Sequence, residues 1–253
     1  MTTIILFIIL HWYGSLFFQT FYLHRYGAHK MFNMSKFWEN VFFGFTYITF
    51  GSSFLSPRAY AILHRMHHAY SDTEKDPHSP HNFADVFKMM WKTAEIYHAF
   101  YTRTVEPDGR FLDHTPEFPK FERWASSWTS RLMWAAIYIG FYVYFVPAGQ
   151  AWLYIFLPMH FLMAPLHGAI VNWCGHKYGY RNYKHSDESK NTLRVDLLMM
   201  GELYQNNHHY APLDTNFAKK WYELDITYPA IWLFGKLGIL KPNLAKLGSN
   251  REF

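Results

Sequence analysis

Three stretches of the sequence are apolar over a length that can cross a lipid bilayer. They cover residues 3–22, 130–146 and 150–171. A helix rises about 1.5 Å per residue, so about 20 apolar residues span a hydrocarbon core roughly 30 Å thick. The uncharged turn PAGQ between the second and third stretches predicts a helical hairpin. We therefore expect three transmembrane helices.

A fourth apolar segment, residues 37–55, has a different pattern. Glu39 and Asn40 lie near its start, and it contains two glycines. If it crossed the bilayer once, the histidine-rich sequences HRYGAH and HRMHH on its two sides would lie on opposite membrane faces and could not share a site. We therefore predict an interfacial or re-entrant helix, and a fourth span is the alternative.

Polar sequence fills the remainder of the chain. Residues 57–129 and 172–253 are mixed in charge and contain loop-like proline and glycine clusters, with helices expected near 83–100 and 228–240. The mean hydropathy of −0.17 fits a membrane protein with a large extramembrane part. The predicted fold is an all-α integral membrane protein, a single domain over 1–253, with a short stem of about three to four transmembrane helices under a helical cytosolic cap.

The distribution of positive charge predicts the orientation. The formal net charge is +5, and basic residues gather at the span ends opposite PAGQ, namely Arg25, Lys30, Lys36, Arg131, Lys177, Arg181 and Lys184. By the positive-inside rule the cap is cytoplasmic, and PAGQ and the N terminus lie outside. The first span lacks the basic region and cleavage site of a signal peptide. With the short loops, this favours a bacterial inner membrane.

The amino-acid composition limits the kinds of molecule that the protein is expected to bind. Positive charge suits anionic lipid headgroups, a phosphate-bearing carrier or an acidic redox partner. The sequence holds no recognised nucleic-acid-binding motif, so we expect no nucleic-acid partner. The one cysteine, Cys174, allows neither an internal disulfide nor a cysteine-ligated iron–sulfur cluster. Electrons for any redox reaction must therefore come from another protein or a different cofactor.

Eight of the sixteen histidines stand in short clusters or beside an asparagine one turn away. They are His24, His29, His64, His67, His68, His176, His208 and His209. A single metal takes four to six ligands, so eight imidazoles indicate a two-metal centre. Imidazole suits Fe, Zn, Cu and Ni, and ligand type alone does not choose among them.

The spacing within the clusters suits a helical metal site. On a helix, His64 shares a face with positions three and four residues on, whereas the adjacent His67 and His68 point about 100° apart and can serve two metals. The pair at 208–209 repeats this arrangement, and Asn172 lies one turn before His176. The i, i+5 spacing of HRYGAH does not align on an α-helix, so we expect the helix to end at Gly27 and turn His29 inward.

The other histidines are assigned structural or solvated roles. This group contains His11, which we expect to be a hydrogen-bonded core residue, and also His78, His81, His98, His114, His160 and His185. His167, one turn before Asn172, is a candidate for hydrogen bonding to a ligand. A non-catalytic, histidine-rich metal-binding membrane protein is an alternative from another class, but the ordered clusters argue against it. A zinc hydrolase is disfavoured because HRMHH lacks the glutamate of HExxH.

Four motifs follow one another among the membrane segments, namely HRYGAH, HRMHHAYSDTEKDPHSP, NWCGHKYG and GELYQNNHHYAP. With these motifs in this order, the chain resembles the membrane-bound fatty-acid desaturases, especially the acyl-CoA delta-9 branch. The resemblance covers most of the chain and implies that the eight clustered histidines hold two irons beside a hydrophobic acyl tunnel. Asn172 resembles the family's asparagine that reaches a metal through water. Gln205 stands where the family's last box has its first histidine, so a neutral amide oxygen replaces imidazole as a candidate ligand.

The resemblance implies an O2-dependent desaturase that introduces a cis double bond, delta-9-like, into a saturated acyl chain at two Fe²⁺ ions. The substrate would be an acyl-CoA, an acyl carrier protein or a phospholipid, and a ferredoxin or cytochrome b5-like protein with its reductase would supply electrons. Asp76 and Asp196 are candidates to orient ligating imidazoles. A diiron fatty acyl hydroxylase or related oxygenase is the nearest alternative. Chain length, double-bond position and oligomeric state are left open.

Overall fold

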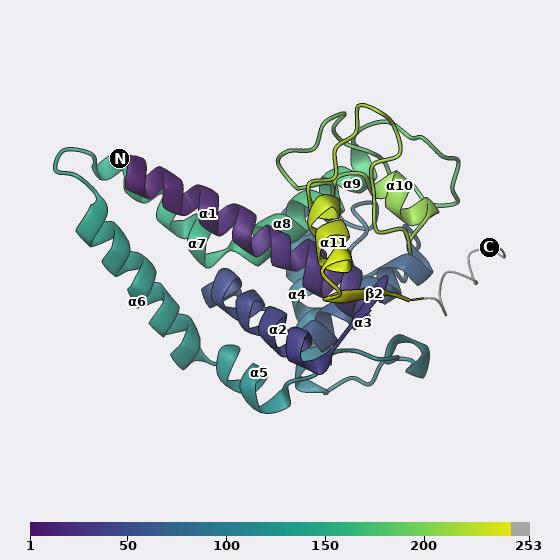
Figure 1. The fold of residues 1–253 in the computed structure, drawn as a ribbon, viewed down its shortest axis with the longest axis horizontal. Helices are drawn as coiled ribbons and strands as arrows, with labels where there is room; N and C mark the ends of the chain where they lie inside the picture. Colours follow the sequence, from purple (N-terminus) through teal and green to yellow (C-terminus); the bar gives the residue numbers. More distant parts are fainter. Residues whose placement is uncertain (244–253) are drawn as a thin grey trace.

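One long helix runs through the molecule and carries the first histidine cluster. The computed structural model describes residues 1–243, and in it α1 (Thr2–Phe18) continues without a break into the π-helix η1 (Gln19–Ala28). The helix α2 (Lys36–Phe50) packs beside α1 and ends in the 3₁₀ turn η2 (Gly51–Ser53). Figure 1 shows α1 and α2 together at the centre of the fold. The predicted helix within 37–55 is thus present.

The third apolar stretch forms a broken helix. It consists of η4 (Ala151–Phe156), α7 (Leu157–Phe161), α8 (Met163–Ala169), η5 (Ile170–Cys174) and α9 (Gly175–Lys177). The two halves meet at Leu162 with a bend of 75°. Pro165 explains the break, because its ring clashes with the carbonyl four residues earlier and it has no N–H to donate.

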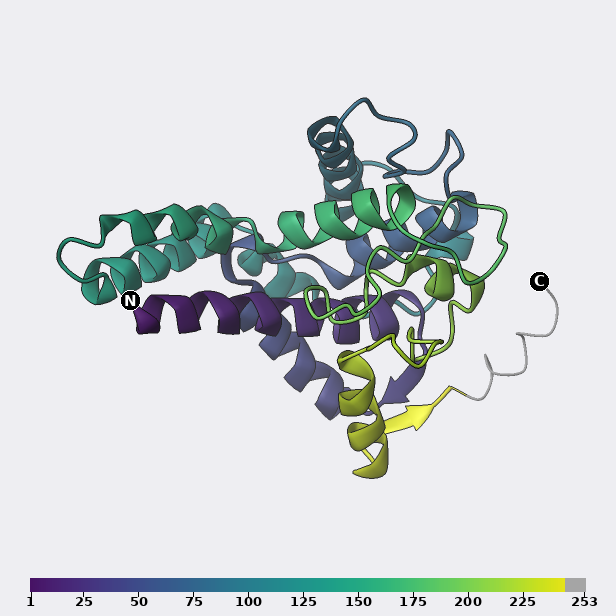
Figure 2. The same ribbon diagram turned by 90° about the horizontal axis from the view of Figure 1, so that it is seen from above.

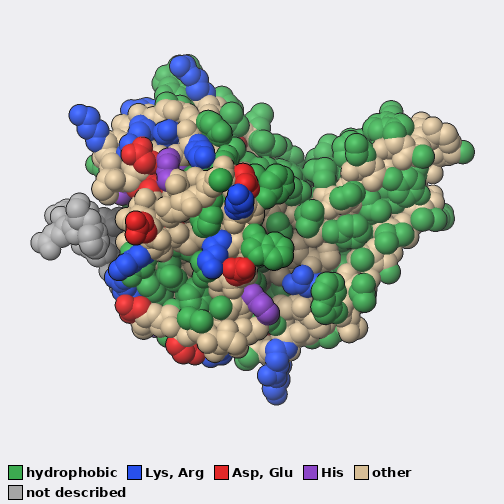
Figure 3. Space-filling model, turned by 180° about the vertical axis from the view of Figure 1, so that it is seen from behind, with side chains coloured by type: hydrophobic (Ala, Val, Ile, Leu, Met, Phe, Trp, Pro, Cys, Tyr) green, Lys and Arg blue, Asp and Glu red, His purple; other side chains and the backbone are tan. Residues whose placement is uncertain are grey.

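Helix α6 (Trp128–Phe145) follows the short α5 (Pro119–Ala125) and packs against α7 beyond the PAGQ turn. Together with α7 and the first turns of α1, it makes an arm that projects from the body (Figures 1 and 2). The face of the arm in Figure 3 carries hydrophobic side chains, whereas lysine, arginine, aspartate and glutamate gather over the body. Exposed apolar side chains of the arm include Leu10, Leu132, Val143, Tyr144 and Ile155. This surface suits contact with lipid.

The number of spans is not confirmed as three. Among residues 1–243, Thr2–Ala28 is the one continuous helix that is long and apolar enough to cross a membrane. A second crossing is obtained if the bent pair Ala151–Phe161 and Met163–Lys177 counts as one span. Helix α6 is long enough but not apolar enough to count as a span, because its polar side chains and its tryptophans and tyrosines lower its mean hydropathy. The stem of three to four transmembrane helices therefore stays a prediction.

The body contains α3 (Pro57–Tyr70), α4 (Val86–Thr102), η3 (Gly109–Phe111), α10 (Gln205–Tyr210) and α11 (Thr227–Lys236). The predicted helix at 83–100 is confirmed as α4. The helix predicted at 228–240 ends earlier, at Lys236, because a turn with Gly238 at a φ of 72° follows it. This turn leads to the strand β2 (Leu240–Pro242), which pairs antiparallel with β1 (Phe32–Met34). Three-residue strands carry too little alternation to be recognised in a sequence. The part of the predicted cap after residue 243 lies outside the described residues.

Two contacts place the histidine-bearing segments side by side. Arg65 on α3 donates from Nε to the carbonyl of Ala28 at 2.7 Å and from a terminal nitrogen to that of Gly27 at 3.0 Å. These bonds hold the end of η1 against α3. On the other side, a Cβ at Gly175 would lie 2.4 Å from Cγ of Gln205. Glycine at this position therefore lets α9 approach α10 closely.

Candidate metal centre

The i, i+5 spacing of His24 and His29 is satisfied by a π-helix. The backbone N–H of His29 donates to the carbonyl of His24 at 3.0 Å, which is the i→i+5 hydrogen bond of this helix type. Both side chains therefore emerge on the same face. The prediction that the helix ends at Gly27 was wrong, because the wider helical turn achieves the alignment without an interruption and continues to Ala28.

The helix α3 carries HRMHH and begins with a conventional cap. Ser56 accepts a hydrogen bond from the backbone N–H of Ala59, and Pro57 occupies the first turn, where its missing N–H is no loss. His64 and His68 lie one turn apart on this helix, with ring centroids 4.7 Å apart. His67 points to a different side and approaches another group of residues.

Five histidines form one cluster, which we call the five-histidine cluster. It draws on η1, α3 and α10, and its ligand atoms all lie within 4.8 Å of one another in His24, His29, His64, His68 and His208. Nε2 of His208 is 3.0 Å from Nε2 of both His24 and His68, and the Nε2 atoms of His29 and His64 are 2.7 Å apart. Two imidazole nitrogens about 2.1 Å from one ion, at right angles, would be about 3.0 Å apart. The spacing therefore suits one ion at the centre.

A second cluster lies beside the first, and we call it the three-histidine cluster. It consists of His67 from α3, His176 from α9 and His209 from α10, all buried. Their ring centroids are 4.9 to 5.0 Å apart, and Nε2 of each is buried without a hydrogen-bond partner. Buried polar atoms are seldom left unpaired. Three such atoms facing one another fit a second ion.

The adjacent histidines are divided between the clusters. His68 and His208 belong to the five-histidine cluster, whereas their neighbours His67 and His209 belong to the three-histidine cluster. The divergence of about 100° between consecutive helical positions produces this division. The eight histidines singled out in the sequence are therefore all brought together in the structure, in two groups.

Carboxylates orient four of these imidazoles. In each of four pairs, Nδ1 of a histidine lies 2.6 to 2.9 Å from a carboxylate oxygen. The pairs are His24 with Glu202, His67 with Asp76, His176 with Asp72, and His209 with Asp187. A carboxylate that accepts from Nδ1–H leaves Nε2 as the ligand atom and increases its basicity. The predicted role of Asp76 agrees with this geometry. Asp196 has another role, because its oxygens accept from the backbone N–H groups of Met199, Gly201 and Leu203.

Burial keeps four of these eight imidazoles neutral, which is the form that binds metal. It lowers the pKa of His64, His68 and His208 well below the ordinary value, and the neighbouring imidazoles lower it further. Burial also lowers the pKa of His209 to about 4, against the opposing effect of Asp187. For His67 burial is again the largest single effect and lowers the pKa, but the charge and hydrogen bond of Asp76 with the charges of Asp72 and Asp187 together outweigh it, so the pKa is raised.

A cavity of about 210 Å³ adjoins both clusters, and we call it the apolar cavity. Its polar wall contains Asn172 and Gln205 together with several of the histidines, so both predicted oxygen ligands lie beside the site. The rest of its wall is largely apolar and comes from α3, α4 and the broken helix, with Leu55, Leu63, Met90, Ala164, Pro165, Gly168 and Val171. Typical ligand pockets hold about 300–1,000 Å³. The apolar cavity is smaller than this range, so it has room for only part of a long ligand.

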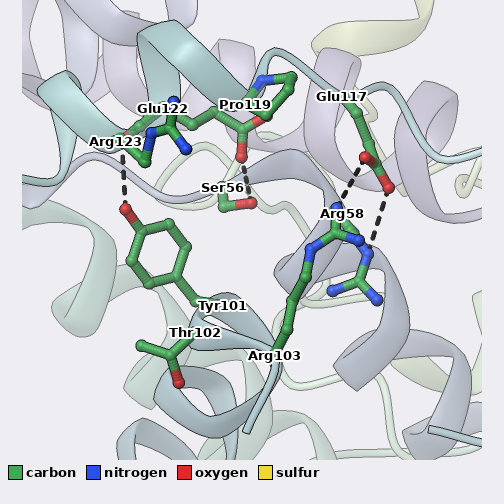
Figure 4. A pocket seen from close by; sticks show the side chains of 9 residues that line it. All are labelled: Ser56, Arg58, Tyr101, Thr102, Arg103, Glu117, Pro119, Glu122 and Arg123. Atoms are coloured by element: carbon green, nitrogen blue, oxygen red, sulfur yellow. Dashed lines mark hydrogen bonds and ion pairs between the residues drawn. The ribbon is translucent and has the colours of Figure 1, made fainter. Parts of the chain in front are cut away.

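A second cavity of about 410 Å³, lined mainly by charged and polar side chains, adjoins it, and we call it the arginine cavity. Figure 4 shows Arg58 and Arg103 both directed at Glu117, with Arg123 on the far wall. The neighbours Leu55 and Ser56 line one cavity each, and the hydroxyl of Tyr97 accepts a hydrogen bond of 2.7 Å from the N–H of Ser56. The two cavities are therefore separated by a thin wall.

Several residues of the site were missed in the sequence. Glu202, Asp72 and Asp187 were not assigned, because a carboxylate that pairs with a distant histidine leaves no spacing signal. Of the histidines assigned structural roles, His78 is buried beside His67, with ring centroids 4.5 Å apart. The expectation for His11 is confirmed, since its Nδ1 lies 2.6 Å from that of His160. His167 contacts Gln19 and neither cluster.

Replacing Glu202 with glutamine is expected to weaken metal binding at the five-histidine cluster by about 10–100-fold, the usual effect of losing such a partner. Burial would raise the pKa of Glu202, but His24 and Arg25 lower it, so the wild-type carboxylate is charged. The amide keeps the shape and removes the charge that holds the His24 tautomer. Metal titration of the purified variant measures the change, with the exposed Glu95→Gln as control. An affinity equal to that of the wild type would contradict this role.

Comparisons with known proteins agree with this arrangement. The family model described as "Fatty acid desaturase" matches residues 2–237. The chain is 29% identical to the "Delta-9 desaturase-like 4 protein" of Arabidopsis thaliana, over 87% of this chain and 69% of that protein. It is 28% identical to the "sn-1 stearoyl-lipid 9-desaturase" of Synechocystis sp., over 86% and 64%, and 25% identical to that of Anabaena variabilis, over 92% and 80%.

Proposed function

Because the chain belongs to the fatty acid desaturase family, we propose that it introduces a cis double bond into a saturated fatty acyl chain, delta-9-like, at two iron ions. The family makes it an oxidoreductase acting on acyl chains. The observation that carries the finer proposal is the contact between two histidine clusters and an apolar cavity. A metal pair beside a cavity that accepts methylene groups is the arrangement that removal of unactivated hydrogen requires.

The donor set fits two irons. His24, His29, His64, His68 and His208 would hold one, and His67, His176 and His209 would hold the other, with Asn172 and Gln205 close by. Imidazole with few oxygen donors suits iron among the first-row metals, as it also suits zinc and copper. When bound, the iron pair supplies O2 activation for hydrogen abstraction.

The protein's own side chains position the acyl chain and exclude water from the reacting atoms. The apolar wall holds two neighbouring methylene carbons next to the clusters and keeps water from the reacting atoms. The four carboxylates hold the Nδ1 protons of their histidines, so the ligand set keeps one geometry through the cycle. Overall, two hydrogens leave the acyl chain, and O2 takes them with two external electrons and two protons to give two waters.

The partners follow from this reaction. A ferredoxin or cytochrome b5-like protein with its reductase would deliver the electrons, because the single cysteine allows no internal iron–sulfur cluster. The cap would face the cytoplasm, in a bacterial inner membrane. An acyl-CoA, an acyl carrier protein and a phospholipid all carry phosphate, at the far end of the pantetheine arm in the first two and on the glycerol headgroup in the third. The arginine cavity, which adjoins the apolar cavity, is a suitable place for that phosphate.

A fatty acyl hydroxylase is the second candidate, because the first hydrogen abstraction is common to both reactions. The relatives named as 9-desaturases favour the desaturase. Gas chromatography with mass spectrometry of total fatty acids, from a host expressing the protein with a matching electron donor, tests the choice. A new double bond supports the proposal, and a hydroxy acid in its place would favour the hydroxylase.

Replacing Gly168 with phenylalanine is expected to abolish desaturation of long chains while both irons stay bound. Gly168 lines the apolar cavity, and a Cβ there would meet Cε of Met90 at an ordinary 3.6 Å. Gly168→Ala therefore fits and serves as control, whereas a benzyl group fills the space proposed for the acyl chain. Product analysis and iron content check the result. Unchanged turnover in the phenylalanine variant would place the acyl chain elsewhere.

A further inference from the structure

Residues 193–198, in the loop between α9 and α10, present an apolar surface, and we call them the leucine segment. The apolar side chains are Leu193, Val195, Leu197 and Leu198, which are 36%, 49%, 52% and 47% exposed. This stretch was expected to belong to the polar cytosolic cap. Apolar surface left in water costs about 25 cal/mol per Å², and contiguous apolar patches mark contact surfaces. The leucine segment therefore has the character of a contact surface.

Two hydrogen bonds hold the leucine segment against the first helix. Nε1 of Trp12 donates to the carbonyl of Leu198 at 3.0 Å. The hydroxyl of Tyr13 donates to the carbonyl of Leu197 at 3.1 Å. Met199, the next residue, is fully buried in a core cluster that includes side chains of α1. The leucine segment therefore lies along α1, at the level of Trp12 and Tyr13.

Tyr13 also marks the point at which α1 passes from the arm into the body (Figures 1 and 2). Leu10 and Tyr13 are exposed, whereas every residue from 14 to 28 is buried or partly buried. The apolar surface of the arm on α1 therefore ends at Tyr13, and the leucine segment continues it. Tryptophan and tyrosine are enriched where hydrocarbon meets water, because their rings are apolar and their tips polar. Trp12 and Tyr13 fit that boundary.

The charged residues of the leucine segment suit the same surroundings. Asp196 is fully buried, and its carboxyl oxygens accept from three backbone N–H groups of the turn that follows, so it presents no acidic group at the surface. Arg194 is exposed, with its guanidinium carbon 5.8 Å from the centroid of the Tyr222 ring. A long basic side chain can place its charge among lipid headgroups while its stem lies beside apolar chains. One cation beside four apolar side chains is complementary to an anionic bilayer surface.

We propose that the leucine segment enters the membrane interface beside α1, with Leu197 and Leu198 among the lipid acyl chains and Arg194 at the headgroups. The segment is then a second membrane contact of the body, separate from the arm. Asp196 joins it to the turn that carries Glu202, whose carboxylate orients a histidine of the five-histidine cluster. The contact therefore fixes the distance between the bilayer and the histidine clusters. It is independent of the reaction that the protein catalyses.

Photocrosslinking of the full-length chain in bilayers of phosphatidylcholine and phosphatidylglycerol tests the proposal. The photoreactive residue p-benzoylphenylalanine replaces Leu197 in one variant, Leu132 of the arm in a second, and His114 in a third. His114 is exposed on the loop that Arg65 joins to the end of η1, away from the arm. Intact mass spectrometry is expected to show lipid adducts at Leu197 as abundant as those at Leu132, and several-fold more abundant than those at His114. Lipid adducts no more abundant than at His114, or a crosslink to a second copy of the chain in their place, would overturn the proposal.

A nitroxide spin label at the neighbouring position gives an independent measurement that does not require the bulky photoreactive group. Replacing the one cysteine, in Cys174→Ala/Leu198→Cys, leaves a single site for the label. In the same bilayers, the label is expected to collide more often with O2, which concentrates in hydrocarbon, than with a water-soluble nickel chelate. The opposite order would show that the leucine segment faces water and would refute its contact with lipid.

Discussion

Replacing His64 with alanine is expected to abolish double-bond formation and to remove iron from the five-histidine cluster. His64 packs against three of the other four rings, with its ring centroid 4.3 Å from that of His24 and 4.7 Å from those of His29 and His68. Losing a partner that only orients a ligand weakens metal binding by about 10–100-fold, so losing a ligand is expected to cost at least the upper end of that range. Iron content and product formation are measured on the same preparation.

The control for this variant is His114→Ala. His114 is exposed on a loop and pairs only with the neighbouring Asp113, so its removal changes the histidine count without changing the clusters. It is expected to keep wild-type iron and activity. If His64→Ala retained full iron and made the same product, the five-histidine cluster would not be the metal site.

The largest loss of stability is expected at the ion pair of Arg25 and Asp225. Both side chains are fully buried, and a terminal nitrogen of Arg25 lies 2.7 Å from Oδ2 of Asp225, while its guanidinium stacks on Phe217 at 3.9 Å. Asp225→Asn leaves a buried arginine without its counterion. Removing one partner of a buried pair costs about 3–5 kcal/mol. In a protein of this size that lowers the unfolding midpoint by roughly 10 °C.

Thermal unfolding of the detergent-purified protein measures this effect, and a double variant identifies its cause. Arg25→Met removes the cation and leaves Asp225 with the backbone N–H groups of Phe217, Thr227 and Tyr228. The double variant Arg25→Met/Asp225→Asn is expected to be more stable than the sum of the two single losses predicts. Additive losses would show that the two charges do not stabilise each other.

Much of the metal site could be predicted because its geometry is local. The division of His67 and His68, and of His208 and His209, between two clusters follows from the angle between consecutive helical residues. The π-helix could not be predicted, because the choice between α and π hydrogen bonding depends on packing against α3. There, Arg65 holds the last carbonyls of η1.

The partners of the ligands could not be predicted for a different reason. Glu202 pairs with His24 across 178 positions, and Asp72 pairs with His176 across 104. Such contacts depend on the tertiary fold and leave no periodic pattern. Asp76, nine residues from His67, was close enough to be proposed. His78 was assigned a structural or solvated role, and the structure shows it buried with no hydrogen-bond partner at either ring nitrogen.

The membrane stem could be predicted less well than the metal ligands and better than their carboxylate partners. The apolar stretches were found at the right positions, but Pro165 breaks the third one into halves bent by 75°. A hydropathy pattern shows which residues are apolar but not the direction in which the helix axis runs. A broken helix and a straight span therefore look alike in the sequence. The count of crossings therefore depends on how the halves lie in a bilayer.

Anomalous diffraction at the iron absorption edge, from crystals of the iron-loaded protein, tests the central claim most directly. The account predicts two separate iron peaks, one among His24, His29, His64, His68 and His208, and one among His67, His176 and His209. It also predicts that the apolar cavity opens next to both. A single peak, or two peaks away from these histidines, would contradict it.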